Sequence, residues 1–330
     1  MSTRQRKITV LTLCALLFAL CFQAQAQQPK KVPRIGYLPS GPISERVHLW
    51  DAFRQGMREL GYVEGQNITL VFPSAEVTPE RLPHLAAELV SLKVDVIVAA
   101  GTPAVQAAKE ATKTIPIVTP ITTEPLETGL VASLARPGGN ITGLSYMSSD
   151  LSGKRLELLR EVVPGVSRIA VLSNPSSATV PPMMRKTEVA ARALGVQLQR
   201  LEVHGPDDFE RVFQAATKER AGALITLDDA FAFTQRTRIV KLATKNRLPA
   251  IYGFREFVEV GGLMSYAANL SDMYRRAATY VDKILKGTKP ADLPVEQPMK
   301  FELVINLKTA EQIGLTIPPN VLVRADKVIK

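Results

Sequence analysis

The chain has 330 residues, of which 46% are hydrophobic and 22% are charged, and a formal net charge of +10. A chain of this length buries a hydrophobic core large enough to fold without disulfides. Its lysines and arginines form neither a dense block nor a stripe interleaved with aromatic residues, which argues against nucleic-acid binding. The positive excess therefore indicates a mildly basic surface, with at most a slight bias toward anionic ligands.

The first 26 residues have the pattern of a signal peptide. Three basic residues lie within the first seven positions, an apolar run covers residues 8–22, and Ala24-Gln25-Ala26 has the form of a cleavage site. We expect cleavage before Gln27 and export to the periplasm. The apolar run has about 15 residues, fewer than the roughly 20 that a transmembrane helix needs. Without the leader, 38 basic residues stand against 31 acidic ones, a net charge of about +7.

Both cysteines, Cys14 and Cys21, lie within this predicted signal peptide. The mature chain is therefore expected to have no disulfide, no thiolate nucleophile and no cysteine-based metal site. Lipidation of Cys21 and retention of the whole segment are the two alternatives to cleavage. Leu20, directly before Cys21, is bulky where a lipoprotein signal has a small residue, which disfavours lipidation.

After residue 33, short apolar runs alternate with amphipathic segments, as strands alternate with helices. In the first half, strands are predicted at 34–38, 68–72, 94–100, 115–119 and 141–146, and helices at 44–60, 79–92 and 103–113. In the second half, strands are predicted at 169–172, 197–203, 223–227, 250–252, 263–266 and 301–306, and helices at 154–163, 182–195, 207–219, 234–245, 272–285 and a short segment ending near 313. Residues 290–298 are rich in proline and are expected to be extended. This order implies parallel, doubly wound sheets.

The second half of the chain repeats the first half at an offset of 134 residues. Arg34-Ile-Gly-Tyr-Leu38 returns as Arg168-Ile-Ala-Val-Leu172, and Leu60-Gly61 returns as Leu194-Gly195. So long a period is that of a lobe and not of a solenoid repeat. We therefore expect an α/β fold with two Rossmann-like lobes, each a doubly wound parallel sheet, and a cleft between them.

Small polar residues follow the predicted strands, at the carboxyl ends where parallel α/β sheets bind ligands. The candidate ligand-binding residues at these positions are Ser40, Gly101, Thr102, Pro103, Thr123, Glu124, Asn174, Asp228 and Asp229. Thr102 is suited to be an N-cap and Pro103 to be the first residue of a helix, whose N-terminus would favour a carboxylate or a phosphate. The alternative is a capped helix without a ligand.

Asp228 and Asp229 occupy the matching place in the second half, where Asp229 corresponds to Thr102. A carboxylate opposite an anion site would bind a cationic group, so the two sites together describe a zwitterion such as an amino acid. A pair of helix-capping acids is the alternative. Tyr146 and Tyr252 lie near strand ends and are candidates for stacking on the ligand, with core or hinge packing as the alternative role.

Catalytic motifs are missing from the sequence. It has no G-x-S-x-G elbow, no P-loop and no G-x-G-x-x-G after a strand, and its three histidines fall in unrelated segments without metal-ligand spacing. We therefore expect a protein that is not an enzyme and that holds neither a metal nor a cofactor.

Several longer motifs are typical of one family. They include Gly101-Thr-Pro-Ala-Val-Gln-Ala-Ala108, Gly129-Leu-Val-Ala-Ser-Leu-Ala-Arg-Pro-Gly-Gly-Asn-Ile-Thr-Gly143, Gly261-Gly-Leu-Met-Ser-Tyr266 and Leu293-Pro-Val-Glu-Gln-Pro298. With them, the chain resembles the ABC-transporter substrate-binding proteins with the type 1 periplasmic-binding fold, in the subgroup related to tryptophan- and tyrosine-binding components. The resemblance covers about residues 33–330. It implies a ligand held between two lobes that are joined by three hinge strands, near Gly143, near Ser265 and within 290–298.

The same resemblance implies the organisation and the role of the chain. Residues 1–26 would be the signal peptide, residues 27–143 and about 267–290 lobe 1, and residues 144–266 and about 298–330 lobe 2. The protein would capture a small polar organic ligand, such as an amino acid, and deliver it to an ABC permease in the inner membrane. A periplasmic sensor that presents its closed form to a receptor or kinase is the alternative. Glu124-Pro125 and Asp229-Ala230 replace the family's usual Asp-Pro pairs, which leaves the ligand open.

Overall fold

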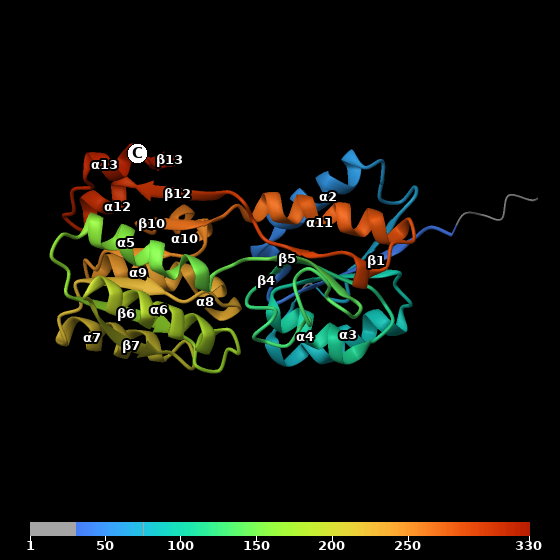
Figure 1. The fold of residues 1–330 in the computed structure, drawn as a ribbon, viewed down its shortest axis with the longest axis horizontal. Coiled ribbons are helices and arrows are strands. Elements are labelled where there is room, and N and C mark those ends of the chain that lie inside the picture. Colours follow the sequence, from blue (N-terminus) through green and yellow to red (C-terminus); the bar gives the residue numbers. More distant parts are fainter. Residues whose placement is uncertain (1–30, 75) are drawn as a thin grey trace, which may run out of the picture. The chain divides into compact units, whose positions relative to one another are not determined.

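Two sheets of mainly parallel strands organise the chain (Figure 1). This computed structural model describes residues 31–74 and 76–330, so the predicted signal peptide and both cysteines lie outside the described residues. Residues 33–330 form one compact unit. Among the described residues, the helices are too short or too polar to cross a membrane.

The first sheet has six strands in the order β11-β5-β4-β3-β1-β2, and every neighbouring pair is parallel. Its strands are β1 (Arg34–Pro39), β2 (Thr69–Val71), β3 (Val96–Ala100), β4 (Ile117–Thr122), β5 (Ile141–Ser145) and β11 (Val295–Glu296). The helical segments around it are η1 (Ile43–Glu45), α2 (Val47–Glu59), η2 (Pro79–Arg81), α3 (Leu82–Ser91), α4 (Thr102–Ala111), α11 (Leu270–Leu285) and η4 (Pro290–Asp292). We call this sheet with its helices lobe 1.

The second sheet has seven strands in the order β13-β12-β10-β9-β8-β6-β7. Its strands are β6 (Arg168–Ser173), β7 (Gln197–Glu202), β8 (Ala223–Thr226), β9 (Ala250–Tyr252), β10 (Met264–Ala268), β12 (Phe301–Asn306) and β13 (Lys327–Ile329). The helical segments around it are η3 (Ser149–Leu151), α5 (Ser152–Val162), α6 (Val180–Leu194), α7 (Asp208–Lys218), α8 (Ala230–Thr234), α9 (Arg236–Lys245), α10 (Arg255–Glu259), α12 (Leu307–Gln312) and α13 (Pro319–Leu322). We call this sheet with its helices lobe 2.

The first five strands of each lobe have the same order in both sheets, β2-β1-β3-β4-β5 in lobe 1 and β7-β6-β8-β9-β10 in lobe 2. The repeated sequence segments are thus β1 and β6, at equivalent places. The predicted doubly wound α/β fold is confirmed, with one departure at the sheet edge. In lobe 2 the added strand β12 runs antiparallel to β10, whereas β11 in lobe 1 runs parallel to β5.

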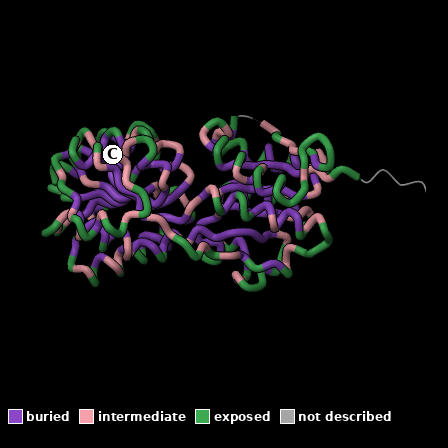
Figure 2. Tube along the Cα trace, turned by 90° about the horizontal axis from the view of Figure 1, so that it is seen from above, coloured by how far each residue is buried: buried purple, intermediate pink, exposed green. Residues whose placement is uncertain are grey.

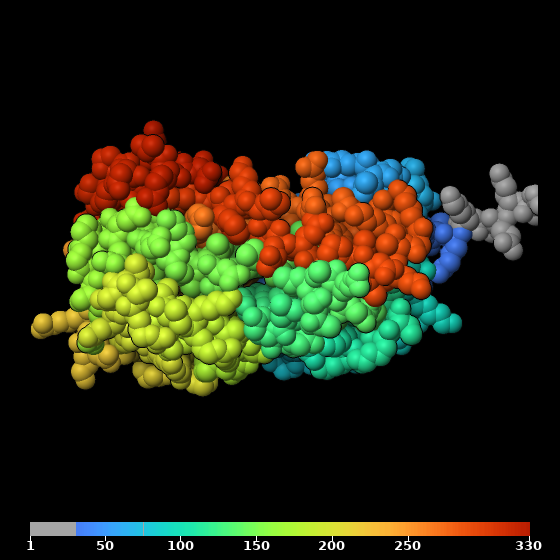
Figure 3. Space-filling view, in the orientation of Figure 1, coloured from blue at the N-terminus to red at the C-terminus, as the bar shows by residue number. Residues whose placement is uncertain are grey.

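Each sheet is covered by helices on both faces, and the strands between them are buried (Figure 2). In lobe 1, α2 and α11 pack together on one face, and α3 and α4 cover the other. Gly56 on α2 makes the first pair possible, because a β-carbon there would lie 2.4 Å from the carbonyl oxygen of Arg275 on α11. The C-terminal part of the chain therefore completes lobe 1, as the orange segment beside the light-blue one shows (Figure 3).

The chain passes between the two sheets three times, at residues 146–148, at residue 269 and at residues 297–300. Gly143 belongs to β5 and precedes the first passage. A β-carbon at Gly143 would lie 2.1 Å from the carbonyl oxygen of Thr119, so only glycine fits beside β4. The segment 290–298, expected to be simply extended, contains η4 and the strand β11.

One expected helix is interrupted in a way that matters for the site. The sequence predicts a single helix over 44–60, but the structure has η1, then Arg46, then α2. Arg46 has φ −128° and ψ 12°, outside helical geometry, and the residue as a whole is 6% exposed. Arg46 lines a cavity inside the molecule.

Candidate functional site

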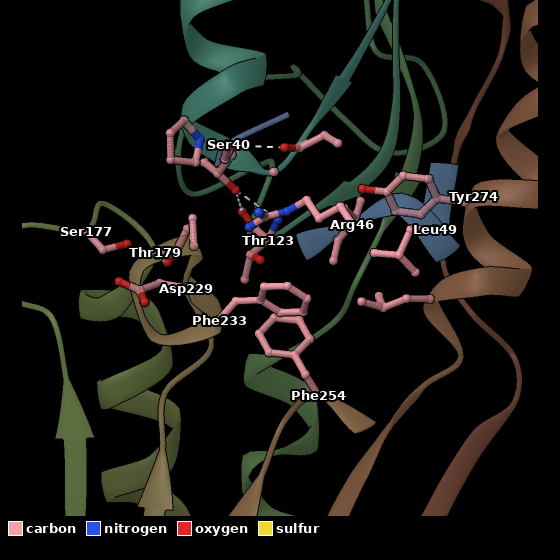
Figure 4. A pocket seen from close by; sticks show the side chains of 17 residues that line it. Ser40, Arg46, Leu49, Thr123, Ser177, Thr179, Asp229, Phe233, Phe254 and Tyr274 are labelled. Carbon is pink, nitrogen blue, oxygen red and sulfur yellow. Dashed lines mark hydrogen bonds between the residues drawn. The ribbon is translucent and has the colours of Figure 1, made fainter. Parts of the chain in front are cut away.

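A cleft between the lobes is lined by residues that follow strands of both sheets (Figure 4). Its inner chamber has a cavity volume of about 50 Å³, and its wider outer part has a volume of about 790 Å³. Ser40, Thr102, Pro103 and Asp229 line both parts. Gly101 and Thr123 line the inner chamber and Asn174 the outer part, so seven of the predicted site residues share one cleft.

The hydroxyl groups of lobe 1 are engaged within the lobe. The Ser40 hydroxyl donates to the carbonyl oxygen of Ala100 at 2.9 Å and accepts from the N–H of Ala104 at 3.1 Å. Ser40, directly after β1, therefore caps α4, whereas the sequence predicts Thr102 as the cap. The helix begins at Thr102 itself and has Gly101 before it. A β-carbon on Gly101 would lie 2.6 Å from Ser40 Oγ, and its φ of +94° also favours glycine.

Thr102 holds the loop after β4. Its hydroxyl donates to the carbonyl oxygen of Thr123 at 3.1 Å and accepts from the N–H of Thr123 at 3.0 Å. The hydroxyl oxygen also lies 3.3 Å from that of Thr122. With these contacts the Thr102 proton is already used, so its side chain positions the cleft wall and has no donor left for a ligand.

Asp229 is the acidic group of the cleft. It caps α8, since its Oδ1 accepts from the N–H of Ala232 at 2.6 Å. Its Oδ2 is buried and has no hydrogen-bond partner among the residues that the structure describes. Burial raises the pKa of Asp229 to about 6, against the lowering effect of the Ala232 N–H and of the Asn174 side chain. A cationic ligand group at Oδ2 would compensate this buried carboxylate.

Aromatic rings form one wall of the inner chamber. Phe233 of α8 and Phe254, two residues after the end of β9, meet edge to face with their centroids 5.2 Å apart. Tyr274 of α11 lines the chamber from lobe 1. Tyr146 lies behind this wall, stacked on Phe254 at 5.1 Å, and its hydroxyl donates to the carbonyl oxygen of Gly253. An aromatic or apolar ligand group can pack against these rings.

The structure adds residues that sequence reasoning did not place at the site. Arg46, Leu49, Thr179, Phe233, Leu270 and Tyr274 line the inner chamber. The apolar ones lie on helices whose periodic faces look like ordinary core in the sequence. No sequence signal separates a helix residue that faces a cleft from one that faces its own sheet.

Asp228, although predicted for the site, lies outside the cleft in a buried ion pair. Its Oδ2 accepts from Arg155 Nη1 at 2.8 Å and from the Ser148 hydroxyl, and the side chains of Asp228 and Arg155 are 0% and 2% exposed. Arg155 Nε also donates to the carbonyl oxygen of Tyr266. Neighbouring acids thus face in different directions, Asp229 toward the cleft and Asp228 toward the passage between the lobes at Ser148.

Glu124, Tyr146 and Tyr252 also lie outside the cleft lining. Glu124 has φ +52°, and its Oε1 accepts from the N–H of Ser149 at 3.1 Å. Burial raises the pKa of Glu124. Tyr252 is buried against Phe257, with ring centroids 4.6 Å apart. These residues pack at the passage between the lobes or in the core of lobe 2. For the two tyrosines, this is the core or hinge packing that was the alternative to stacking on a ligand.

Metal-binding clusters are absent from residues 31–74 and 76–330, since no three histidine, aspartate or glutamate side chains are grouped to hold an ion. The geometry of the cleft is that of a binding site. It has one buried carboxylate, one buried guanidinium and a wall of rings, all fixed by elements of the two lobes.

Two α/β lobes with a cleft at the carboxyl ends of their strands define the class of type 1 periplasmic binding proteins. Within this class, residues 45–329 match the family described as ABC transporter substrate binding protein. The chain belongs to this family, whose members bind ligands.

Three relatives show the similarity in more detail. The chain is 28% identical over 264 residues to the tyrosine-binding protein of Clostridioides difficile, covering 80% of this chain and 75% of that one. It is 26% identical to an ABC domain from Streptococcus pneumonia in complex with L-Trp, with a TM-score of 0.84 and coverage of 90% and 99%. It is 25% identical to the ligand-free, open structure of a substrate binding protein with adhesive properties from Clostridium difficile, with a TM-score of 0.69 and coverage of 91% and 100%.

Proposed function

We propose that this protein is the exported solute-binding component of an ABC importer and that it captures an aromatic α-amino acid in the cleft between its lobes. One observation carries the proposal. The unpartnered Oδ2 of Asp229 lines the same chamber as the rings of Phe233, Phe254 and Tyr274. An ammonium group would pair with the carboxylate, and an aromatic side chain would pack on the rings.

The relatives support this ligand class. One of them is a tyrosine-binding protein and another is in complex with L-Trp. The structure also superposes better on the L-Trp complex than on the ligand-free, open structure, with TM-scores of 0.84 and 0.69 at nearly equal sequence identity. This difference supports a lobe arrangement close to that of a ligand-bound protein.

The mechanism follows from the two-sided lining of the cleft. A ligand that contacts Asp229 and Phe233 of lobe 2 and Tyr274 of lobe 1 makes all these contacts only when the lobes are together. It therefore shifts the population toward the closed form, as the passages at residues 146–148, 269 and 297–300 bend. In the periplasm, the closed protein would then dock on its permease and release the ligand for import.

A binding experiment tests the proposal. The purified protein is first unfolded, dialysed to remove any bound ligand and refolded, and is then screened by thermal shift against amino acids, sugars, nucleosides and organic acids. A ligand at a hundred times its dissociation constant raises the free energy of unfolding by about 2.7 kcal/mol. We expect the largest shift from L-tryptophan or L-tyrosine. Stabilisation by another class of solute, with none by aromatic amino acids, would contradict the assignment.

A further inference from the structure

Arg46 is a buried cation in the inner chamber. Arg46 lies between η1 and α2, at the interruption of the expected helix, and is 6% exposed as a residue. Its side chain lines the chamber together with Asp229 and Phe233 (Figure 4). In the close-up view, the guanidinium lies between Ser40 of lobe 1 and the rings of Phe233 and Phe254.

The contacts of this guanidinium leave most of its donors unused. Nη1 donates to the carbonyl oxygen of Pro42 at a long 3.4 Å, and the guanidinium carbon lies 4.8 Å from the centroid of Phe233. Among the described residues, no carboxylate forms an ion pair with Arg46, since the adjacent acid, Glu45, binds Arg236 at 2.8 Å. A guanidinium has five N–H donors, and a buried one without an anion is costly.

Gly41 fixes where the guanidinium can lie. A β-carbon built on Gly41 would be 2.7 Å from Nη1 of Arg46 and 3.1 Å from Nη2. Any larger residue at position 41 would therefore shift the guanidinium to another position, and the arginine would keep its positive charge. This contact makes the position of the charge testable separately from the charge itself.

Two hydroxyl groups of lobe 1 that line the chamber are already engaged. The Ser40 hydroxyl donates to Ala100, and the Thr102 hydroxyl donates to Thr123. Neither proton is available to an anionic ligand group. Arg46 is the cationic donor in the lining of the inner chamber, and its planar fork matches the geometry of a carboxylate.

We infer that Arg46 is the anchor for the ligand's carboxylate, and that a bound amino acid spans the cleft from Arg46 of lobe 1 to Asp229 of lobe 2. The inference rests on the proposed function. A carboxylate fits better than a phosphate, because the chamber is small and already holds the carboxylate of Asp229, which repels a dianion. Arg46 therefore determines specificity for free amino acids over their amides and esters.

Calorimetry with matched ligands and variants tests the anchor. The ligands are L-tryptophan, L-tryptophanamide, which replaces the carboxylate by a neutral group of the same shape, and indole-3-propionate, which lacks the amine. The variants are Arg46→Met, Gly41→Ala and Arg58→Met, the last an exposed arginine on α2 that serves as the control. We expect Arg46→Met to lower the affinity for L-tryptophan and for indole-3-propionate about tenfold to a hundredfold. Its affinity for L-tryptophanamide should stay within about twofold of the wild-type value.

Gly41→Ala keeps the arginine and is expected to lower the affinity for the same two ligands by a smaller factor. Arg58→Met should bind all three ligands like the wild type. Equal weakening of L-tryptophan and its amide in Arg46→Met would overturn the anchor and leave the proposed function standing. Binding of a carboxylate from a different chemical class, with no binding of aromatic amino acids, would contradict the proposed function. If Arg46→Met then lost affinity for that carboxylate ligand but not for its amide, the result would still support Arg46 as the carboxylate anchor.

Discussion

The helix after the third strand begins differently in the two lobes, although the strand order around it is the same. In lobe 1, α4 is capped by the hydroxyl of Ser40, the residue directly after β1. In lobe 2, α8 is capped by Asp229, the residue directly before it. A hydroxyl that donates once and accepts once has little left to offer. A carboxylate that caps through one oxygen still has a second oxygen for a ligand.

This difference divides the chemistry of the cleft between the lobes. Lobe 1 contributes the cation, Arg46, and uses its hydroxyls to hold its own loops together. Lobe 2 contributes the anion, Asp229, and the rings of Phe233 and Phe254. The two lobes thus share one framework while their cleft-lining side chains carry opposite charges, which suits a zwitterionic ligand.

The largest expected effect concerns the buried ion pair between Arg155 and Asp228 in lobe 2. Arg155→Met leaves the Asp228 carboxylate buried without its partner and should lower the free energy of unfolding by about 3–5 kcal/mol. Urea denaturation measures the loss. Arg160→Met, an exposed position on the same helix, is the control and should change little. Equal stability of the two variants would show that the ion pair does not support the lobe.

The second effect concerns the ligand oxygen of Asp229. Its pKa is raised to about 6 by burial, so below that pH a proton competes with the ligand's ammonium group. Affinity for L-tryptophan should be constant above about pH 7 and fall about tenfold per pH unit well below pH 6. Asp229→Asn keeps a capping side chain, and should bind about tenfold to a hundredfold more weakly at neutral pH without this acid-side fall.

Calorimetry over a pH series measures both properties. Glu311→Gln removes one exposed charge of lobe 2 and serves as the control, with the pH profile of the wild type. An unchanged profile in Asp229→Asn would show that the acid-side fall belongs to another group. The assignment of the ammonium to Asp229 would then fail.

The third effect separates capping from ligand binding. Ser40→Ala removes the cap of α4 and should lower the free energy of unfolding by about 0.5–2 kcal/mol, with ligand affinity nearly unchanged. Asp229→Ala should lower both, because its carboxylate has both roles. Denaturation and calorimetry on the two variants sharpen the contrast between the lobes. A loss of affinity in Ser40→Ala as large as that in Asp229→Ala would remove it.

The smallest effect concerns a partly exposed contact between the lobes. His48 of α2 lies 3.6 Å from Glu256 of α10, which raises the pKa of His48, with Glu259 adding to the rise and burial and Arg236 opposing it. The raised pKa means that protonated His48 favours closure below its ordinary pKa, and that this contribution is lost as the pH rises through the raised value. His48→Gln should therefore weaken binding by no more than about threefold at mildly acidic pH and not at all at alkaline pH.

The ratio of the affinities of wild type and His48→Gln, followed over pH, isolates this contact from the opposite trend of Asp229. A ratio that does not change with pH would show that the His48–Glu256 contact makes no contribution to closure.

Much of the framework is predictable from local patterns. Buried strands such as β3 and β8 read as short apolar runs, and the repeat of Arg34–Leu38 at Arg168–Leu172 indicates two equivalent lobes. Positions after strands likewise point to Ser40, Thr102 and Asp229, because parallel strands end at one edge. The antiparallel β12 was not predictable, since strand direction depends on where the chain re-enters the sheet.

The sequence by itself determined the α/β class, the duplication and the strand ends that meet at the cleft, because these follow from periodicity and chain order. Only the tertiary structure decided which polar groups remain available there. Ser40 and Ala104 are 64 residues apart, and Arg155 and Asp228 are 73 apart, so no local pattern shows that these groups satisfy one another. Arg46 and the second oxygen of Asp229 stand out only after every other partner is in place. The binding chemistry of the cleft is what the folded lobes leave unpaired.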